Sequence, residues 1–318
     1  MHLPKILGGP ARLAAALAAV ALAACAPKNE TLRTLESVVL RDSVPVDATL
    51  WLDHAGRAWV GRAGSLTAFD TAGNALGGMA VPLRGTPQVL WTAKGRTYLR
   101  TAGAAAVANA QGRQAGVRRS EAPVAADPRG RWVYTATRTG SVLGLSPETL
   151  AARWGWPDAG SAVTSLAVSP LGDRVYVALA GNSARQVNAG IEIRDALSGR
   201  LLSTFLTDAG MKALQVGPDG TLYGVVGGSV MALRHGPEGL KQLWVRKMGG
   251  IGGPDPDALR VSPDGARVAV LERGRSLHLL AAADGKVLQE SKRAPRDAAW
   301  DASGRLWVLG AREIRIVR

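Results

Sequence analysis

The sequence predicts an all-β fold in which short strands repeat as the blades of a ring. Two observations lead to this prediction: a turn motif recurs along the chain, and a second pair of strands follows each copy. The motif places an apolar residue four positions before a glycine, as in LDHAGRAWVG, VSPLGDRVYV and WDASGRLWVL. Seven copies are centred on Gly56, Gly95, Gly130, Gly172, Gly220, Gly265 and Gly304, which are 35 to 48 residues apart.

Each copy has the pattern of a strand, a tight turn and a second strand. Glycine supplies the positive φ that a short hairpin needs. Three residues after each glycine stand residue types that favour strands, namely Trp59, Tyr98, Val133, Val175, Tyr223, Val268 and Trp307. A further strand pair follows, as in residues 190–195 and 201–205. Units of four short strands and about 40 residues are typical of β-propeller blades, and seven of them fill residues 35–318.

The two ends of this segment predict a closed ring. The last unit has strands near 297–300, 305–309 and 313–317, so it lacks its fourth strand. Residues 35–40 precede the first full unit and can supply that strand, which would remove the open sheet edge. An eight-bladed ring and an open array of sheets are the alternatives.

The amino-terminal segment has the features of an export signal. A basic start (His2, Lys5, Arg12) is followed by an uncharged run, 13–24, which is too short to span a bilayer as a mature helix. The run ends in Leu22-Ala23-Ala24-Cys25, which resembles a bacterial lipobox. The resemblance implies that residues 1–24 are cleaved, that Cys25 carries a lipid, and that residues 25–34 are a tether. An ordinary secretory signal with cleavage nearby is the alternative.

The repeats also resemble a known family. SPLGDRVYVAL followed by IEIRDALSGRLLSTF, in the fourth unit, is similar to YVTN and WD40-like propeller repeats. The match is clearest in the fourth and sixth units and looser in the others, and no Trp-Asp dipeptide closes a blade in the WD manner. The resemblance implies a seven-bladed β-propeller and leaves the subfamily open.

The net charge indicates the kind of partner, and the cysteine content excludes stabilisation by disulfides. The net charge of +14 falls to +12 once residues 1–24, which contain Lys5, Arg12 and no acid, are removed. Such a charge predicts attraction to anionic partners, although a compositional bias toward arginine would also raise it. Cys25 is the sole cysteine, so disulfides cannot stabilise the exported protein.

One feature of the loops suggests a binding surface. The connection between the second and third strands contains arginine in six of the seven units, and propeller topology puts these connections on one face. A group of guanidinium side chains can bind carboxylates, phosphates or sulfates. The binding residues predicted in this way are Arg62, Arg100, Arg138, Arg185, Arg273, Arg275 and Arg312. Chance would place an arginine in about half of such loops, so composition is the competing explanation.

The sequence gives little sign of catalysis. His54 and His235 fall in connections of the opposite face and His278 lies within a strand, so no metal site and no cofactor are expected. Asp219 and Asp264 stand in Pro-Asp-Gly turns and are expected to stabilise those turns. Trp154 and Trp156 are expected to be the most exposed tryptophans.

Three hypotheses about function follow. The first is a lipoprotein of the cell envelope, on the extracytoplasmic side of a membrane, whose propeller binds a protein or an anionic polymer on the arginine-bearing face. The second is an enzyme like the YVTN-related lactonases or the quinone-dependent dehydrogenases, which would need acids, histidine or arginine near the ring axis, and of these only arginine is evident. The third is a lipoprotein that senses a solute or a signal. A monomer is expected, with no nucleic acid as partner.

Overall fold

The structure is a computed structural model that describes most of the chain after residue 29. The described residues are 30–32, 34–40, 43–53, 57–70, 74–81, 85–93, 96–101, 104–108, 114–119, 123–137, 139–248 and 255–317. Cys25, the expected signal peptide and Arg138 lie outside them. No helix within these ranges is long and apolar enough to cross a membrane.

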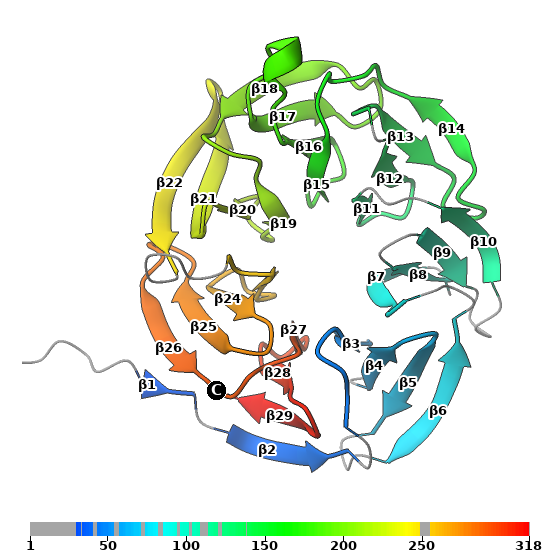
Figure 1. Cartoon of the computed structure of the whole chain (residues 1–318), viewed down its shortest axis with the longest axis vertical. Helices are drawn as coiled ribbons and strands as arrows, with labels where there is room; N and C mark the ends of the chain where they lie inside the picture. Colours follow the sequence, from blue (N-terminus) through cyan, green and yellow to red (C-terminus); the bar gives the residue numbers. More distant parts are fainter. Residues whose placement is uncertain are drawn as a thin grey trace, which may run out of the picture.

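Seven antiparallel four-stranded sheets form a closed ring, as the sequence predicts (Figure 1). Blade one contains β3 (Thr49–Leu52), β4 (Ala58–Arg62), β5 (Ser65–Phe69) and β6 (Ala75–Ala80). Blade two contains β7 (Gln88–Ala93), β8 (Arg96–Arg100), β9 (Ala104–Ala108) and β10 (Gln114–Arg119). Blade three contains β11 (Val124–Ala126), β12 (Val133–Ala136), β13 (Val142–Leu145) and β14 (Ala152–Gly155).

The remaining blades repeat this order from the axis outward. Blade four contains β15 (Val163–Val168), β16 (Arg174–Leu179), β17 (Gly190–Asp195) and β18 (Leu201–Leu206), with the short 3-10 helix η1 (Ser183–Arg185) between its second and third strands. Blade five contains β19 (Lys212–Val216), β20 (Leu222–Val226), β21 (Ser229–Gly236) and β22 (Gly239–Lys247). Blade six contains β23 (Ala258–Val261), β24 (Arg267–Glu272), β25 (Ser276–Ala281) and β26 (Val287–Ser291). Blade seven contains β27 (Asp297–Trp300), β28 (Leu306–Leu309), β29 (Glu313–Val317) and the amino-terminal strand β2 (Thr34–Val39).

The repeated glycines make the turns that the sequence predicts. Between the first and second strands, Gly130, Gly172, Gly220, Gly265 and Gly304 have φ values between 63° and 82°. Gly56 and Gly95 lie outside the described residues. The residue three positions after each glycine lies on the second strand, where Tyr98, Tyr223 and Trp307 are each 2% exposed. The hairpin therefore aims these side chains into the contacts between blades.

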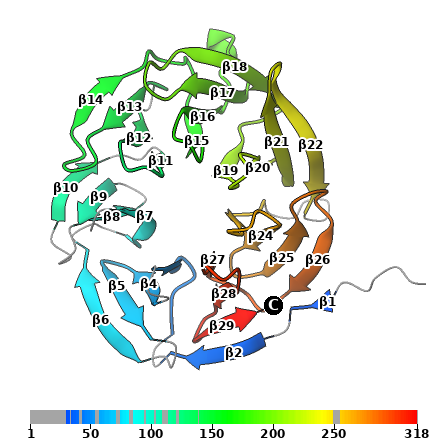
Figure 2. The same ribbon diagram turned by 180° about the vertical axis from the view of Figure 1, so that it is seen from behind.

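The amino-terminal segment closes the ring, as predicted. β2 pairs antiparallel with β29, from Thr34 opposite Val317 to Val39 opposite Glu313, with a register shift between Thr34 and Glu36. A further strand, β1 (Glu30–Thr31), pairs in parallel with β26 and extends blade six to five strands. Both strands lie on the outer rim of the ring (Figure 2). Leu32, between them, is 9% exposed and packs in the core between blades six and seven, so the last part of the expected tether contacts the propeller.

The core consists of apolar layers between neighbouring blades. In blade three it includes a stack of tryptophans, in which the rings of Trp154 and Trp156 are 5.2 Å apart and nearly parallel. The expected exposure of this pair is therefore wrong for Trp156, which is 5% exposed. Glycines make room for the rings, because an added Cβ on Gly144 would lie 2.1 Å from Trp154 and one on Gly199 would lie 2.0 Å from Trp156.

Candidate functional site

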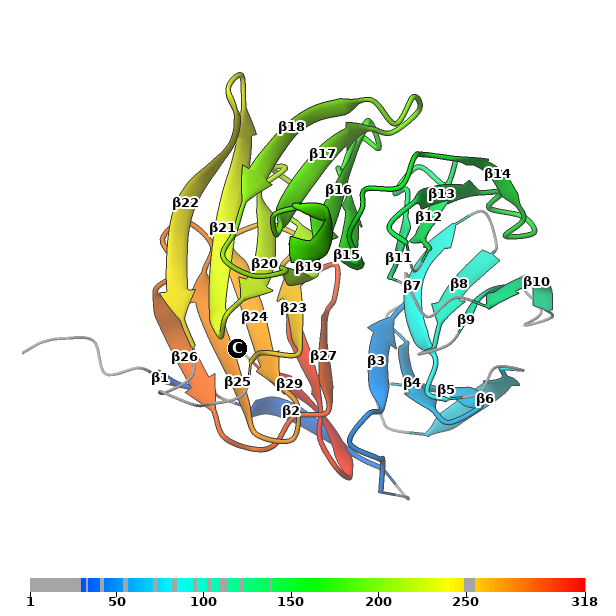
Figure 3. The same cartoon turned by 45° about the horizontal axis from the view of Figure 1, so that its top comes forward.

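Strand direction divides the propeller into two faces. Because each blade is an antiparallel meander, the connections between second and third strands lie on the same side as those between blades. We call this side the arginine face. The opposite side carries the hairpins between first and second strands and between third and fourth strands, and we call it the turn face (Figure 3).

Six of the seven predicted arginines belong to the described residues, and they lie on the arginine face. Arg62 and Arg100 end the second strands of blades one and two, and both are half-buried. Between the second and third strands of blades four, six and seven stand Arg185, Arg273, Arg275 and Arg312. Of these four, Arg273 is half-buried and the others are exposed.

Arginines on both faces of the propeller form ion pairs. On the turn face, four arginines are each paired with an aspartate at 2.6 or 2.7 Å: Arg57 with Asp53, Arg131 with Asp127, Arg234 with Asp219, and Arg305 with Asp301. Two further arginines of that face, Arg129 and Arg200, are exposed and have no ion pair with the described residues.

On the arginine face, one of the predicted residues has a carboxylate partner at close range. Arg185 Nη1 lies 3.2 Å from Asp158 Oδ2. The side chains of Arg100, Arg273, Arg275 and Arg312 make no hydrogen bond or ion pair with any residue that the structure describes. These four guanidinium groups therefore have no carboxylate partner among the described residues.

Arg100 lies in an environment that disfavours its charge. Burial lowers the pKa of Arg100, and the positive charges of Arg260 and Arg273 lower it further. Both of those residues belong to blade six, on the opposite side of the ring axis from blade two (Figure 1).

Arg260 was not among the predicted residues, and a buried aspartate fixes it in place. Its Nη2 donates to both carboxylate oxygens of Asp297, at 3.0 and 3.3 Å, and its Nε donates to the carbonyl of Ala298 at 3.2 Å. Asp297 is 0% exposed and also accepts the N–H of Leu50 in blade one at 3.0 Å. One carboxylate thus links blades six, seven and one.

A sequence signal for this arrangement exists. Asp297 is the first residue of an innermost strand, and it is the one acidic residue at that position in the seven blades. An acid in that position predicts a buried cationic partner, because an unpaired charge there would be costly.

The turn face carries a structural motif that recurs in blades one and seven. Asp301 accepts hydrogen bonds from Arg305 Nε at 2.7 Å and from Trp307 Nε1 at 3.0 Å, and Asp53 binds Arg57 and Trp59 in the same way. The aligned motifs LDHAGRAWVG and WDASGRLWVL already contain these residues, so the spacing Asp-x3-Arg-x-Trp was a readable signal.

The remaining polar residues singled out in the sequence have local structural roles. Asp219 and Asp264 accept backbone N–H groups of their own turns at 3.0 Å, as expected. His235 lies 2.9 Å from Arg174 Nη1, and burial together with that charge lowers its pKa. His278 contacts Ser276 Oγ at 3.0 Å, and His54 lies outside the described residues. No group of three or more potential metal ligands occurs within the described ranges.

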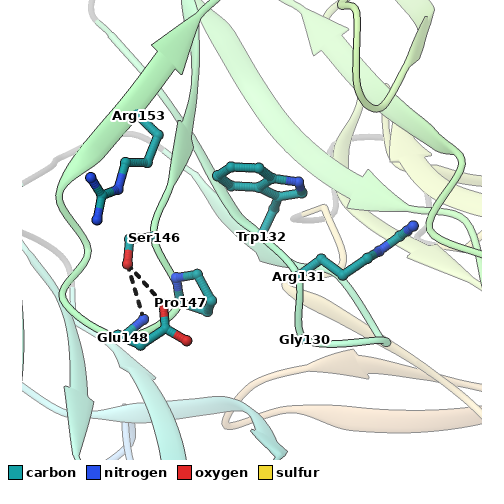
Figure 4. Close-up of a pocket in the computed structure, with 7 residues that line it drawn as sticks. All are labelled: Gly130, Arg131, Trp132, Ser146, Pro147, Glu148 and Arg153. Carbon is teal, nitrogen blue, oxygen red and sulfur yellow. Dashed lines mark hydrogen bonds between the residues drawn. The ribbon is translucent and has the colours of Figure 1, made fainter.

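A pocket of about 410 Å³ opens between two turns of blade three on the turn face (Figure 4). Trp132, Pro147 and Arg153 line it, together with Gly130, Arg131, Ser146 and Glu148. The charges of its walls are mostly compensated, because Arg131 binds Asp127 and Glu148 pairs with Arg96 of blade two at 3.3 Å. The arginine face is therefore the more strongly charged candidate site.

Comparison with known proteins supports the fold and gives no family. No family model and no curated protein matches the chain. Among solved structures, the β-propeller domain of Cps50 (Swd1) from Myceliophteria thermophila superposes with a TM-score of 0.73 over 90% of this chain and 99% of that chain, at 13% identity. Hydrazine synthase from Kuenenia stuttgartiensis superposes with a TM-score of 0.67 over 88% and 97%, also at 13% identity. At this identity the likeness shows the propeller fold alone.

Proposed function

We propose that this chain is an envelope lipoprotein, anchored in a membrane through Cys25, whose arginine face binds an anionic protein or polymer. The observation that carries the binding role is a set of four arginines on one face that have no ion pair with any described residue. Four arginines of the turn face are neutralised by aspartates, whereas Arg100, Arg273, Arg275 and Arg312 have no such partner among the described residues. Arg129 and Arg200 of the turn face also lack an ion pair with the described residues, so the binding role rests on the four guanidinium groups of this kind in the strand connections of one face.

The physical basis of binding is charge complementarity. Guanidinium groups bind carboxylates, phosphates and sulfates through paired, charge-assisted hydrogen bonds. The net charge of +12 expected after cleavage adds long-range attraction, which increases the rate of association with an anionic partner. The surface therefore favours a polyanionic partner over a neutral one.

The direction of the amino-terminal strands suits an anchored module. β2 runs antiparallel to β29 and ends where Leu40 N–H donates to the carbonyl of Arg312, so it runs from the turn face toward the arginine face. Residues 25–29 can span at most about 17 Å when fully extended. An anchor at Cys25 would hold the rim of the propeller near the lipid, with the arginine face turned outward.

The enzymatic alternative lacks a specific observation in its favour. It needs an accessible acid or base beside the arginines at the axis. Asp297, which pairs with Arg260, is 0% exposed. The exposed Asp257 accepts the backbone N–H of Arg273 at 2.7 Å and so supports the loop that carries this arginine.

The anchor is tested by Cys25→Ala. We expect the variant to fold but to leave the detergent phase in a phase-partitioning assay, because the thiol is the attachment point. A wash at high salt removes adsorption that depends on the positive charge. Retention of Cys25→Ala on membranes after this wash would contradict the lipoprotein assignment.

The binding role is tested with two quadruple variants of equal charge. The first replaces Arg100, Arg273, Arg275 and Arg312 with Ala, and the control replaces the exposed Arg129, Arg153, Arg200 and Arg246. Heparin serves as the polyanionic probe, with the dissociation constant measured at about 0.15 M salt to limit long-range attraction. We expect the first variant to bind at least tenfold more weakly, since four contacts of up to about 1 kcal/mol each are lost. Equal losses in the two variants would refute a role for the arginine face.

A further inference from the structure

We propose that the arginine face of blades six and seven is a docking surface for an acidic segment of another protein that also carries apolar side chains. The inference rests on the proposed function, because it places the anionic partner on one part of the arginine face and names the chemistry of that partner. We call this surface the junction patch. It consists of six exposed residues, namely Arg275, Lys292, Arg293, Arg312, Val39 and Val46.

Backbone hydrogen bonds hold together the loops that carry the cations. The loop between β24 and β25 contains Arg275, and its Gly274 N–H donates to the carbonyl of Pro295 at 2.7 Å. Pro295 belongs to the connection between β26 and β27. In that connection the N–H of Arg296 donates to the carbonyl of Leu309, at the end of β28, also at 2.7 Å. Two hydrogen bonds therefore join three loops of blades six and seven, which are neighbours in the ring (Figure 2).

The chain that follows β2 lies against the same loops. Leu40 N–H donates to the carbonyl of Arg312 at 2.8 Å, so the end of β2 lies beside the loop between β28 and β29. A Cβ added to Gly274 would lie 3.3 Å from Cγ2 of Val46. The connection from β2 to blade one therefore contacts the loop that contains Arg275, and the junction patch is continuous.

The cations of the junction patch have few acidic partners. Arg275, Arg293 and Arg312 form no ion pair with any residue that the structure describes. Lys292 Nζ lies 3.9 Å from Glu290 Oε1, at the limit of an ion pair. An acidic ligand would supply the carboxylates that these guanidinium groups can bind through paired hydrogen bonds.

Two carboxylates next to the junction patch are engaged by other groups. Glu313 Oε1 lies 3.1 Å from Arg315 Nε, and Glu313 Oε2 accepts the hydroxyl of Ser37 at 3.1 Å. Asp47 accepts the hydroxyl of Thr86. These interactions keep both carboxylates away from the three arginines.

The apolar side chains of the junction patch indicate which kind of polyanion it binds. Val39 is 76% exposed and Val46 is 52% exposed. Val39 ends β2 opposite Glu313, and the preceding Val38 is buried, so Val39 points away from the core. Apolar side chains together with arginine are typical of interfaces between proteins, whereas a sulfated or phosphorylated polymer would gain nothing from the valines. The combination favours a protein segment that carries both acidic and apolar side chains.

Two fluorescent decapeptides of equal charge test the proposal. One alternates glutamate with leucine, and the other alternates glutamate with serine. Fluorescence anisotropy with the full chain at about 0.15 M salt gives their dissociation constants. We expect Lys292→Ala/Arg293→Ala to weaken binding of both peptides by about fivefold or more. Val39→Ser/Val46→Ser should weaken only the leucine peptide, to the level of the serine peptide.

Matched controls separate position from composition. Arg200→Ala/Arg246→Ala removes the same charge from exposed positions elsewhere, and Leu171→Ser/Leu197→Ser removes two exposed apolar side chains from the turn face. Both controls should stay within about twofold of the parent. If Lys292→Ala/Arg293→Ala matches its control, the junction patch is not a binding surface. If the valine variant binds the leucine peptide as the parent does, the choice of a protein segment is wrong.

These outcomes are separable from those of the heparin experiment. Heparin binding lost only in the first quadruple variant, with no peptide binding that depends on Lys292 and Arg293, would retain the proposed function and remove the protein segment. Peptide binding that depends on the cations and valines of the junction patch, with equal heparin losses in both quadruple variants, would retain the junction patch and remove the role of the other predicted arginines.

Discussion

Replacing Asp297 with Ala should be among the most destabilising single substitutions in this protein. The carboxylate is 0% exposed and accepts hydrogen bonds from Arg260 Nη2, Leu50 N and Ala298 N, at 3.0, 3.0 and 2.9 Å. These donors belong to three different blades at the position where the ring closes. Loss of the carboxylate therefore affects closure as well as one ion pair.

The expected loss of stability in Asp297→Ala follows from two groups that lose their partner, the Arg260 guanidinium and the Leu50 N–H. Removing one partner of a buried ion pair costs about 3 to 5 kcal/mol. The Arg260 side chain is 18% exposed and can regain some hydration, so the lower end, about 3 kcal/mol, applies here. The orphaned N–H of Leu50 adds about 1 kcal/mol. The total of about 4 kcal/mol corresponds to a fall in Tm of about 8 °C at roughly 2 °C per kcal/mol in a large domain.

Differential scanning calorimetry of three variants tests this value. Asp297→Ala should lose about 8 °C, and Asp297→Asn should lose about half as much, because the amide oxygen still accepts one backbone N–H. Asp208→Ala removes the same charge from an exposed position and should leave Tm within about 1 °C. A fall of less than about 2 °C for Asp297→Ala would show that the carboxylate does not hold the blades together.

Three further outcomes are expected. Deleting residues 26–41 should expose the free edge of β29 and cause aggregation, measured by light scattering. Deleting residues 26–32 removes β1 and Leu32 but keeps β2, so it should lower Tm without aggregation. Equal behaviour of the two deletions would contradict closure of the ring by β2. Burial alone would raise the pKa of Asp301, but hydrogen bonds from Ser303, Trp307 and Arg305 outweigh it and lower the pKa to about 2. The ionised Asp301 contributes about 2 kcal/mol to the free energy of unfolding above pH 4, and this contribution disappears as the pH falls toward 2. The unfolding free energies of Asp301→Asn and the parent, measured in urea, should therefore differ at pH 5 and converge in acid. Gly144→Ala should lower the unfolding free energy by about 1 to 3 kcal/mol and change the near-ultraviolet circular dichroism, because the new methyl group overlaps the Trp154 ring; an unchanged spectrum would mean that the tryptophan stack tolerates it.

The repeat made the fold predictable in detail. The glycine of each hairpin and the residue three positions later are local features, since a turn and the strand after it depend on a few consecutive residues. The closing strand was also predictable, because the last unit lacked one strand and residues 35–40 could supply it. Each of these features reappears in the structure, with Gly304 at φ 78° and β2 paired with β29.

The contacts between distant segments were not predictable in the same way. Counting strands per blade gave no reason to expect β1, which adds a fifth strand in parallel to β26. Trp156 was expected to be exposed from its place near an outer strand, yet Gly199 of the next blade leaves room for its ring to be buried. Both outcomes depend on the shape of a neighbouring blade.

The sequence by itself determined the propeller and its closure, because hairpins and strand alternation are set over a few residues. The tertiary structure alone decided which charged groups pair across blades. Asp297 fixes Arg260 only because three blades meet at one carboxylate. The physical reason is that electrostatic interactions depend on the distance between charges in space, and their separation along a chain of 318 residues does not give that distance.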